Sequence, residues 1–297
     1  MPIQSKTLQL SDRFPLPDPE RRGRLLKAAL DEDIGQGDHT SLACLRKELT
    51  GEAQLVAKDE GVIAGVYLAR EVFQLVDRSI EVIPHVNDGD SVRPGNTILH
   101  AKGPAASLLS AERVMLNFMQ RLSGIATATR DMVQVLEGSG IKVLDTRKTT
   151  PGIRLLEKWA VTVGGGYNHR FGLDDMVLIK DNHIDFCGGV TEALNRVAVY
   201  LKENSLDLPV VIEARTMEEV EEVLAAENVY RILLDNFTPG QLKMATERIA
   251  GRITTEASGN IGPSNAHAYK DTGVDFISSG SLTHSVKCLD LSLKTVF

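Results

Sequence analysis

Cationic side chains gather in one stretch of this chain, which reads LDTRKTTPGIRLLEKWAVTVGGGYNHRFGLDDMVLIKDNHI. Arg binds planar carboxylates through two parallel hydrogen bonds, and Lys meets phosphates as a compact point charge. Any one of these side chains alone could equally be a solvated residue at a loop end. As a group they predict a site for a ligand with several negative charges. The cationic residues that stand out in the stretch are Arg147, Lys148, His169, Arg170 and Lys180.

Six short apolar runs in the second half of the chain predict the elements that position these cations. Helix-length amphipathic segments separate the runs, a pattern that indicates parallel strands with crossover helices. Each run ends in polar residues, and the carboxyl ends of the strands form the active-site face of a β/α barrel. Six strands are fewer than the eight of a closed barrel, so we expect an open, incomplete β/α barrel. The runs are 142–145, 176–179, 210–213, 231–235, 253–257 and 275–278.

A doubly wound sheet is the alternative for these strands, although no GxGxxG motif follows the first run. The later strand ends carry a different chemistry from the cationic stretch. Glu213 and Asp235 could hold sugar hydroxyls or Mg²⁺, the hard cation that accompanies phosphates. Either carboxylate could instead be a structural partner of Arg215 or of a neighbouring lysine.

Small residues follow the last two strands and predict a place for phosphates. Ser258-Gly259-Asn260 and Gly280-Ser281 would let backbone amides approach a ligand closely, and each precedes a possible helix N-terminus. No serine or cysteine nucleophile with an adjacent base is recognisable beside His183 or His284. These features favour electrostatic rather than covalent catalysis.

The first half of the chain predicts a smaller α/β unit. A polar arm with several prolines leads into a helix over about 20–32, and the next loop is a turn capped by Asp38 or Thr40. Residues 51–65 alternate well enough for a strand pair, and 66–77 have helical spacing. Turn-bounded strands follow in a segment that resembles half of a biotinyl or lipoyl carrier domain, without the lysine that a carrier needs.

Two helices are expected next, one capped by Ser110 and a second over about 125–136. In the first helix Arg113, Asn117 and Arg121 recur at intervals of four residues, which places them on one polar stripe. Such a stripe is more often a solvated face than a functional one.

The composition excludes several classes of protein. The chain has 297 residues, 42% of them hydrophobic, which is enough for two globular domains. A net charge of -7 argues against a nucleic-acid partner. No apolar run reaches about 18 residues, and the N-terminus lacks the apolar core of a signal peptide, so we expect a cytoplasmic protein without a membrane partner. Three widely spaced cysteines indicate neither a zinc site nor disulfides.

The cationic stretch resembles the signature of quinolinate phosphoribosyltransferase, also called nicotinate-nucleotide pyrophosphorylase (carboxylating). The resemblance covers nearly the whole chain except about the first twenty residues. The other segments that carry it are ALDEDIGQGDHTS, SAERVMLNFMQRLSGIAT, LLDNF, EASGNI and TGVDFISSGSLTHS.

This resemblance implies the architecture and the assembly. An N-terminal arm, 1–20, would precede an α/β sandwich domain, 21–122, which the last residues, about 284–297, would join. Residues 123–283 would form the open β/α barrel. The protein would be a homodimer with active sites at the subunit interface, and further assembly of dimers is left open.

The resemblance also implies the substrates and the roles of individual residues. Lys148, Glu213 and Asp235 would be catalytic. Mg²⁺ would lie near Glu213 and Asp235, held mostly through the pyrophosphate, and no organic cofactor is implied. The quinolinate ligands would be Arg113 from the neighbouring subunit, Thr146, Arg147, His169, Arg170 and Lys180. The phosphoribosyl pyrophosphate ligands would be Lys148, Glu213, Asp235, Ser258, Gly259, Asn260, Gly280, Ser281 and His284.

The chemistry of the implied reaction agrees with the residues. Quinolinate carries two adjacent carboxylates, which call for several cations. Loss of pyrophosphate from the sugar gives an oxocarbenium-like transition state, which nearby carboxylates and Mg²⁺ would stabilise. The ring nitrogen becomes positively charged once it is ribosylated, and this charge is an electron sink for loss of CO₂.

Two departures from the family pattern concern strand ends. Glu213 is followed by Ala214 and Arg215 where the family commonly has further acidic or polar residues, which puts the assignment of Glu213 in doubt. The turn SSGS, with Ser279 and Ser281 around Gly280, replaces the more usual SVGA. The rival functions are a nicotinate phosphoribosyltransferase, which acts on a monocarboxylate, and a carrier module.

Overall fold

The computed structural model describes residues 16–296, which form two compact units. Most of the expected N-terminal arm lies outside the described residues. Helix α5 (Arg154–Val163) groups with the first unit, although the sequence analysis assigned it to the barrel. The first unit comprises residues up to Arg130, Thr149–Gly165 and Ser285 onward, and the second comprises Asp131–Lys148 and Gly166–His284.

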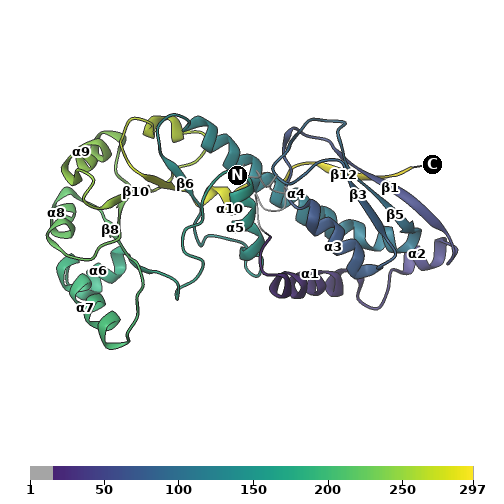
Figure 1. The fold of residues 1–297 in the computed structure, drawn as a ribbon, viewed down its shortest axis with the longest axis horizontal. Helices are drawn as coiled ribbons and strands as arrows, with labels where there is room; N and C mark the ends of the chain where they lie inside the picture. The colour runs from purple at the N-terminus through teal and green to yellow at the C-terminus, as the bar shows by residue number, and fades with distance from the viewer. Residues whose placement is uncertain (1–15, 297) are drawn as a thin grey trace, which may run out of the picture. The chain divides into compact units, whose positions relative to one another are not determined.

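A four-stranded antiparallel sheet forms one layer of the first unit, in the order β12-β1-β5-β3. Helices α3 (Val66–Val76) and α4 (Ala105–Val135) form the layer that faces it (Figure 1). The C-terminal strand pairs with β1, where Leu293 is opposite Leu55. This unit is therefore an α/β sandwich, as expected. The strands are β1 (Thr50–Ala57), β3 (Glu81–Pro84), β5 (Thr97–Pro104) and β12 (Leu291–Val296).

The predicted strand pair over 51–65 is wrong. Strand β2 (Gly61–Val62) pairs with β4 (Ser91–Val92) in a separate small sheet. Strand β1 cannot take β2 as a neighbour because β5 and β12 already occupy both of its edges. The two segments are adjacent in sequence, and their partners come from distant parts of the chain.

The prediction of two helices between 110 and 136 is also wrong, because α4 continues through Gly124 for 31 residues. The reason for a glycine there is packing. A Cβ atom at Gly124 would lie 2.2 Å from the carbonyl oxygen of Lys287, so only glycine lets that segment cross the helix so closely. A glycine within a helical pattern can indicate either the end of the helix or a position where another segment crosses the helix closely.

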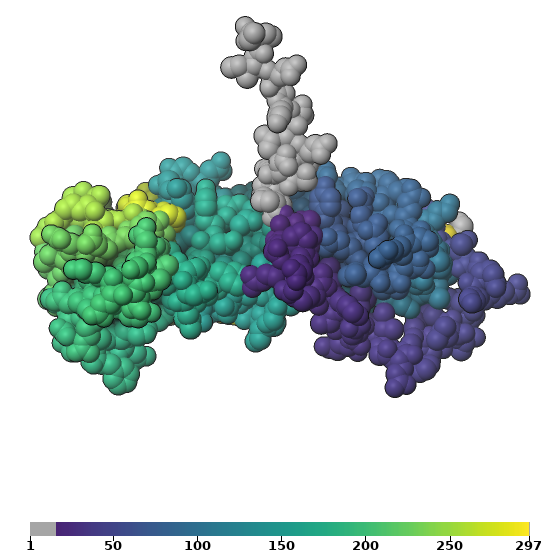
Figure 2. All heavy atoms as spheres, turned by 60° about the horizontal axis from the view of Figure 1, so that its bottom comes forward, coloured from purple at the N-terminus to yellow at the C-terminus, as the bar shows by residue number. Residues whose placement is uncertain are grey.

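Two short-range predictions are confirmed in the first unit. Helix α1 (Pro19–Ile34) forms part of the surface in Figure 2 (purple), and it buries Leu26 and Leu30. Helix α2 (His39–Cys44) begins at Asp38, whose Oδ1 accepts a hydrogen bond of 3.0 Å from the Ser41 amide. This carboxylate satisfies an amide that the first turn of a helix leaves unpaired.

The second unit contains the six predicted parallel strands, in the order β6-β11-β10-β9-β8-β7. Strands β6 and β7, the first two in sequence, are the two edges of the sheet and do not pair with each other. The strand order between them lacks the reversal that defines a doubly wound sheet. The barrel is therefore open. The strands are β6 (Lys142–Leu144), β7 (Val177–Ile179), β8 (Val210–Ala214), β9 (Arg231–Asp235), β10 (Thr254–Ser258) and β11 (Phe276–Ser278).

Helices connect the barrel strands, and Figure 1 shows α7, α8 and α9 along the outer side of the sheet. The connections contain α6 (Asp181–Cys187), α7 (Val190–Glu203), α8 (Met217–Ala225), α9 (Pro239–Ile249) and a 3₁₀ turn η2 (Ala266–Tyr269). Helix α10 (Ser281–His284) follows the last barrel strand, β11. Within residues 16–296 no helix is long and apolar enough to cross a membrane. The three cysteines are free thiols.

Candidate active site

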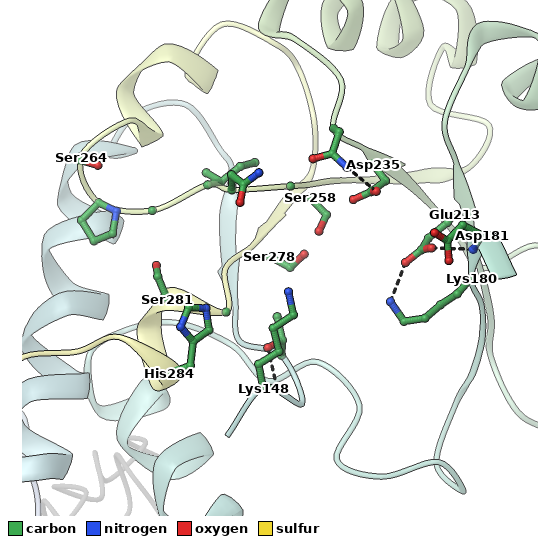
Figure 3. A pocket seen from close by; sticks show the side chains of 18 residues that line it. Lys148, Lys180, Asp181, Glu213, Asp235, Ser258, Ser264, Ser278, Ser281 and His284 are labelled. Atoms are coloured by element: carbon green, nitrogen blue, oxygen red, sulfur yellow. Dashed lines mark hydrogen bonds and ion pairs between the residues drawn. The ribbon is translucent and has the colours of Figure 1, made fainter. Parts of the chain in front are cut away.

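A pocket of about 630 Å³ lies at the carboxyl ends of the barrel strands (Figure 3). All the residues expected to bind the sugar donor line this pocket, together with Thr146 and Lys180 from the expected quinolinate set. Parallel strands bring these residues together because all the strands end at the same edge of the sheet. The lining residues that the sequence analysis named are Thr146, Lys148, Lys180, Glu213, Asp235, Ser258, Gly259, Asn260, Gly280, Ser281 and His284.

Glu213 is held by the loop that follows β7. Its Oε1 lies 2.8 Å from Lys180 Nζ, and its Oε2 accepts a 2.9 Å hydrogen bond from the Asp181 amide (Figure 3). The side chain of Glu213 is almost buried, whereas Lys180 is half exposed. Arg215, the other partner considered, pairs with Glu219 and Asp185 instead. Lys180 is therefore anchored at the pocket by the strand-end carboxylate of β8.

Asp235 supplies a second carboxylate beside Glu213. Burial raises the pKa of Asp235 above its ordinary value, and the charge of Glu213 raises it further, while Lys180 opposes both effects. Ser258 is its register partner on β10, so the carboxylate lies next to the loop that follows that strand. Negative charge at this point is thus only partly neutralised by the protein.

The two carboxylates fit a magnesium ion that is held mainly by a ligand. Among residues 16–296 no group of three or more His, Cys, Asp or Glu side chains could hold a metal ion. Mg²⁺ usually keeps one or two protein carboxylates and completes its octahedron with waters and substrate phosphates. The raised pKa of Asp235 fits this arrangement, since a cation would relieve the repulsion between the carboxylates.

Two glycines shape other parts of the pocket wall. Gly259 has φ +108°, and a Cβ atom there would lie 2.3 Å from Asn236 Oδ1. At Gly280 a Cβ atom would lie 2.8 Å from Lys148 Cδ and 3.0 Å from the His284 ring. Gly259 needs glycine because of its positive φ and because the Asn236 backbone approaches it closely. At Gly280 the close neighbours are side-chain atoms of Lys148 and His284.

The expectation that a helix N-terminus follows each of these glycines is wrong for Gly259. After Asn260 the chain forms a loop that reaches only the 3₁₀ turn η2. Gly280 does precede α10, which has four residues. The loop folds on itself instead, since the Gly262 amide donates to Asn265 Oδ1 at 2.8 Å. Backbone and side-chain groups of the loop, rather than a helix dipole, face the pocket.

His169 and Arg170 are buried and do not line this pocket, and Arg147 is not among its lining residues either. The His169 amide donates to Asp145 Oδ1 at 2.8 Å, and its Nδ1 accepts from the Arg170 amide at 2.7 Å. The ring is thereby oriented with Nε2 toward the barrel interior. In this structure His169 is held by protein groups on both ring edges.

A buried carboxylate faces the other ring nitrogen of His169. Glu256 Oε2 lies 3.4 Å from His169 Nε2 and 2.8 Å from Arg231 Nη1. Burial raises the pKa of Glu256, but hydrogen bonds and charge from His169, Ser278 and Arg231 outweigh it and hold the pKa below its ordinary value. Glu256 is therefore an ionised group inside the barrel.

Arg147 and Arg170 are close enough to repel each other. Burial lowers the pKa of Arg170, and the charge of Arg147 lowers it further. Arg170 Nη1 donates to the Met176 carbonyl oxygen at 3.1 Å, but its Nε is buried without a hydrogen-bond partner in the part of the chain that the structure describes. Two neighbouring guanidiniums, one of them with an unused donor, favour a planar, multiply anionic ligand.

Arg113 belongs to the first unit, and the structure places it on an exposed face of α4. Asn117 on the same stripe is exposed as well. Arg121 differs, because its Nη2 lies 2.8 Å from the fully buried Glu157 and donates to Thr150 Oγ1 at 3.2 Å. The stripe thus contains one arginine with a structural partner and one that faces solvent.

Sequence reasoning missed the network behind the pocket. Arg231 and Glu256 lie within apolar runs that the sequence analysis treated as buried strands. A charge inside a buried strand has to be paired, so each of these two residues was a detectable signal. Asp145 gave a similar signal at the end of β6, where its side chain is fully buried.

The fold and the site together define a protein of the open β/α-barrel type whose strand-end pocket combines lysines, carboxylates and glycine turns. Two family models match the chain: the C-terminal domain of quinolinate phosphoribosyl transferase over residues 125–294 and the N-terminal domain over 38–123. The chain belongs to the quinolinate phosphoribosyltransferase family.

Curated relatives and a solved structure agree with this membership. A mitochondrial quinolinate phosphoribosyltransferase (decarboxylating) from Nicotiana tabacum is 48% identical, covering 91% of this chain and 81% of the relative. A chloroplastic nicotinate-nucleotide pyrophosphorylase (carboxylating) from Arabidopsis thaliana is 47% identical over the same shares. The crystal structure of NadC from Streptococcus pyogenes has a TM-score of 0.89 and 41% identity, covering 94% of this chain and 99% of that one.

Proposed function

We propose that this protein transfers the phosphoribosyl group of phosphoribosyl pyrophosphate to quinolinate and removes one carboxylate, giving nicotinate mononucleotide, pyrophosphate and CO₂ for NAD biosynthesis. Membership of the family supports this reaction, because the relatives carry the name of the decarboxylating enzyme. The observation that carries it is one pocket in which the cations Lys148 and Lys180 meet Glu213, Asp235 and the glycine turns.

Quinolinate would bind at the Lys180 side of the pocket. Arg147 and Arg170 would grip its two carboxylates, and Lys180 would complete the charge balance from the Glu213 side. Thr146 lines the same region, and His169 would act by holding Arg170. A monocarboxylate such as nicotinate would leave several of these cations without a partner, which is the argument against the rival transferase.

The sugar donor would bind between the carboxylates and the glycine turns. Lys148 and His284 lie beside Gly280, where they would meet phosphate oxygens. Glu213 and Asp235 would stabilise the positive charge that develops on the ribose as pyrophosphate leaves. When bound, Mg²⁺ would neutralise charge on the leaving pyrophosphate.

Decarboxylation would need no organic cofactor. The ribosylated ring nitrogen carries a positive charge, which stabilises the electron pair that the breaking C–C bond leaves on the adjacent ring carbon until a proton from solvent binds there. The protein's part is to hold the ring so that only the adjacent carboxylate is lost. The arginine pair would therefore act by orientation as well as by binding.

A homodimer with shared active sites is part of the proposal. Arg113 is exposed on α4, and a partner subunit's pocket would give its charge a ligand. A cytoplasmic location also remains a proposal, since the relatives include mitochondrial and chloroplastic proteins.

A single assay tests the reaction. The purified protein would be incubated with phosphoribosyl pyrophosphate, MgCl₂ and either carboxyl-labelled quinolinate or nicotinate. We expect labelled CO₂ and nicotinate mononucleotide from quinolinate only. Turnover of nicotinate without turnover of quinolinate would overturn the proposal. Intact mass spectrometry with no biotinyl or lipoyl adduct would dispose of the carrier rival.

A further inference from the structure

The turn after β11 carries two hydroxyls that contact each other beside the pocket. Ser279 Oγ lies 2.6 Å from the carbonyl oxygen of Ile261 and 2.8 Å from Ser281 Oγ. Ser279 is almost fully buried, whereas Ser281 lines the pocket (Figure 3). These two residues, the hydroxyl pair, link the turn to the loop that follows β10.

Counting hydrogens determines the direction of these bonds. A carbonyl oxygen can only accept, so Ser279 must donate its single hydroxyl hydrogen to Ile261. Ser279 then has only lone pairs to offer Ser281, and Ser281 has to be the donor of the second bond. The hydroxyl hydrogen of Ser281 is thus directed away from the pocket, although its oxygen lines the wall.

The same turn also holds the loop that bears Lys148. Thr283 Oγ1 donates to the Lys148 carbonyl oxygen at 2.8 Å. On the other side, a Cβ atom at Gly262 would lie 3.0 Å from Ser281 Oγ, which shows how closely the two loops approach. The turn therefore contacts both the loop that bears Lys148 and the loop that follows β10, where the phosphates of the sugar donor are expected to bind.

We propose that the hydroxyl pair determines how the protein holds the phosphates of its sugar donor. Ser279 is a positioning residue that keeps the loop after β10 against the turn. Ser281 contacts the donor directly, by rotating its hydroxyl from Ser279 to a phosphate oxygen. This inference rests on the proposed function, because it assumes a phosphorylated substrate.

Rotation of the Ser281 hydroxyl moves no heavy atom. The change of acceptor from the Ser279 oxygen to a phosphate oxygen is favourable. A hydroxyl bonds more strongly to a charged phosphate oxygen than to a neutral hydroxyl. Lys148 and His284, which border the same turn, would keep the phosphate within reach. Ser279 retains its bond to Ile261 throughout, so the loop stays in place while Ser281 changes partner.

Matched substitutions isolate each hydroxyl. Ser279→Thr and Ser279→Val introduce side chains of nearly the same shape, of which only threonine keeps a hydroxyl. Ser281→Ala removes the hydroxyl that would contact the donor. We expect Ser279→Val and Ser281→Ala each to raise the KM for phosphoribosyl pyrophosphate roughly tenfold, with the quinolinate KM changed less than about twofold. Ser279→Thr should stay closer to wild type than Ser279→Val.

The double variant and a direct binding measurement add independent readouts. Because the two hydroxyls act as one unit, Ser279→Val with Ser281→Ala should cost less than the product of the single effects. Calorimetric titration with inorganic pyrophosphate in MgCl₂ should show the same weakening for Ser281→Ala. The control is Ser139→Ala. It removes a hydroxyl that donates a 2.6 Å hydrogen bond to the Leu136 carbonyl oxygen and does not line the pocket.

The outcomes separate this inference from the proposed function. A wild-type protein that releases no CO₂ from quinolinate contradicts the function, and the pyrophosphate titration still tests the hydroxyl pair. An active wild type with an unchanged donor KM in Ser281→Ala overturns the inference alone. Equal rises in both KM values would also overturn it. Should Ser279→Val fail to fold, Ser281→Ala at its half-buried position decides the matter.

Discussion

At the scale of single residues, the arginines behind the pocket show how an anion site is built. Arg147 and Arg170 repel each other, and a protein keeps such a pair only where a ligand or fixed acceptors repay the cost. The backbone around Arg170 is fixed through His169 and Asp145, so its guanidinium does not have to be ordered when a ligand binds. Preorganisation of this kind gives binding energy that a flexible surface arginine cannot.

We predict that Arg170→Ala weakens quinolinate binding selectively. Loss of a charge-assisted pair costs on the order of 2–4 kcal/mol, so the quinolinate KM should rise by roughly 30-fold or more. The donor KM should change far less, and steady-state kinetics with each substrate varied in turn measures both. Arg147→Ala should behave in the same way.

The control for this prediction is Arg196→Ala, which removes an exposed arginine that pairs with Glu192 on α7. It should leave both KM values unchanged. Equal losses for quinolinate and the sugar donor in Arg170→Ala would contradict the assignment of Arg170 to the dicarboxylate.

At the scale of elements, helix α3 starts at a buried carboxylate. Asp88 Oδ1 accepts hydrogen bonds from the amides of Gly65 and Val66, at 2.6 and 2.9 Å. Burial raises the pKa of Asp88 to about 6, even though these bonds oppose the shift. The folded protein therefore binds a proton at Asp88 in a pH range where the unfolded chain has already released it.

The sign of the pH effect follows from this difference. A folded pKa above the unfolded value stabilises the protein below the unfolded pKa, and this contribution is lost as the pH rises through about 6. The side-chain amide introduced by Asp88→Asn does not titrate in this range. We predict that wild type, compared with Asp88→Asn, gains roughly 2.4 kcal/mol of unfolding free energy between pH 7.5 and pH 4.

Urea unfolding of the two proteins at several pH values measures this gain. The exposed Asp207→Asn serves as the control and should follow the pH dependence of wild type. A constant difference between wild type and Asp88→Asn across this range would show that Asp88 does not titrate there.

At the scale of the whole molecule, the candidate quinolinate residues are divided between the two units. Arg113 lies on α4 of the first unit, and Lys180 lies at the pocket of the second. In a homodimer with shared sites, each pocket would take its Lys180 from one chain and its Arg113 from the other. Such a division makes the activity depend on association.

Complementation tests that dependence. Arg113→Ala and Lys180→Ala should each be nearly inactive alone. After mixing and refolding, half the molecules would be mixed dimers with one intact site of two, so we predict recovery of about a quarter of wild-type activity. Verified mixed dimers that stay inactive would contradict the shared site. Mixing either variant with itself is the control.

Residue patterns alone were enough to predict the six parallel strands and most of the pocket wall. Strand-end residues such as Lys148, Asp235 and Ser258 could be predicted because every parallel strand delivers its end to the same edge. Short-range patterns were also sufficient for the cap at Asp38, whose partner is three residues away.

The pairing of groups that are far apart in the sequence could not be predicted and is known from the folded structure. Glu256 meets Arg231 and His169 inside the barrel, and Gly124 marks a chain crossing within α4 rather than a helix end. Likewise, β2 found its partner in β4 and not in its sequence neighbour. Local periodicity contains no information on such contacts, because burial and pairing depend on which distant segment packs against each element.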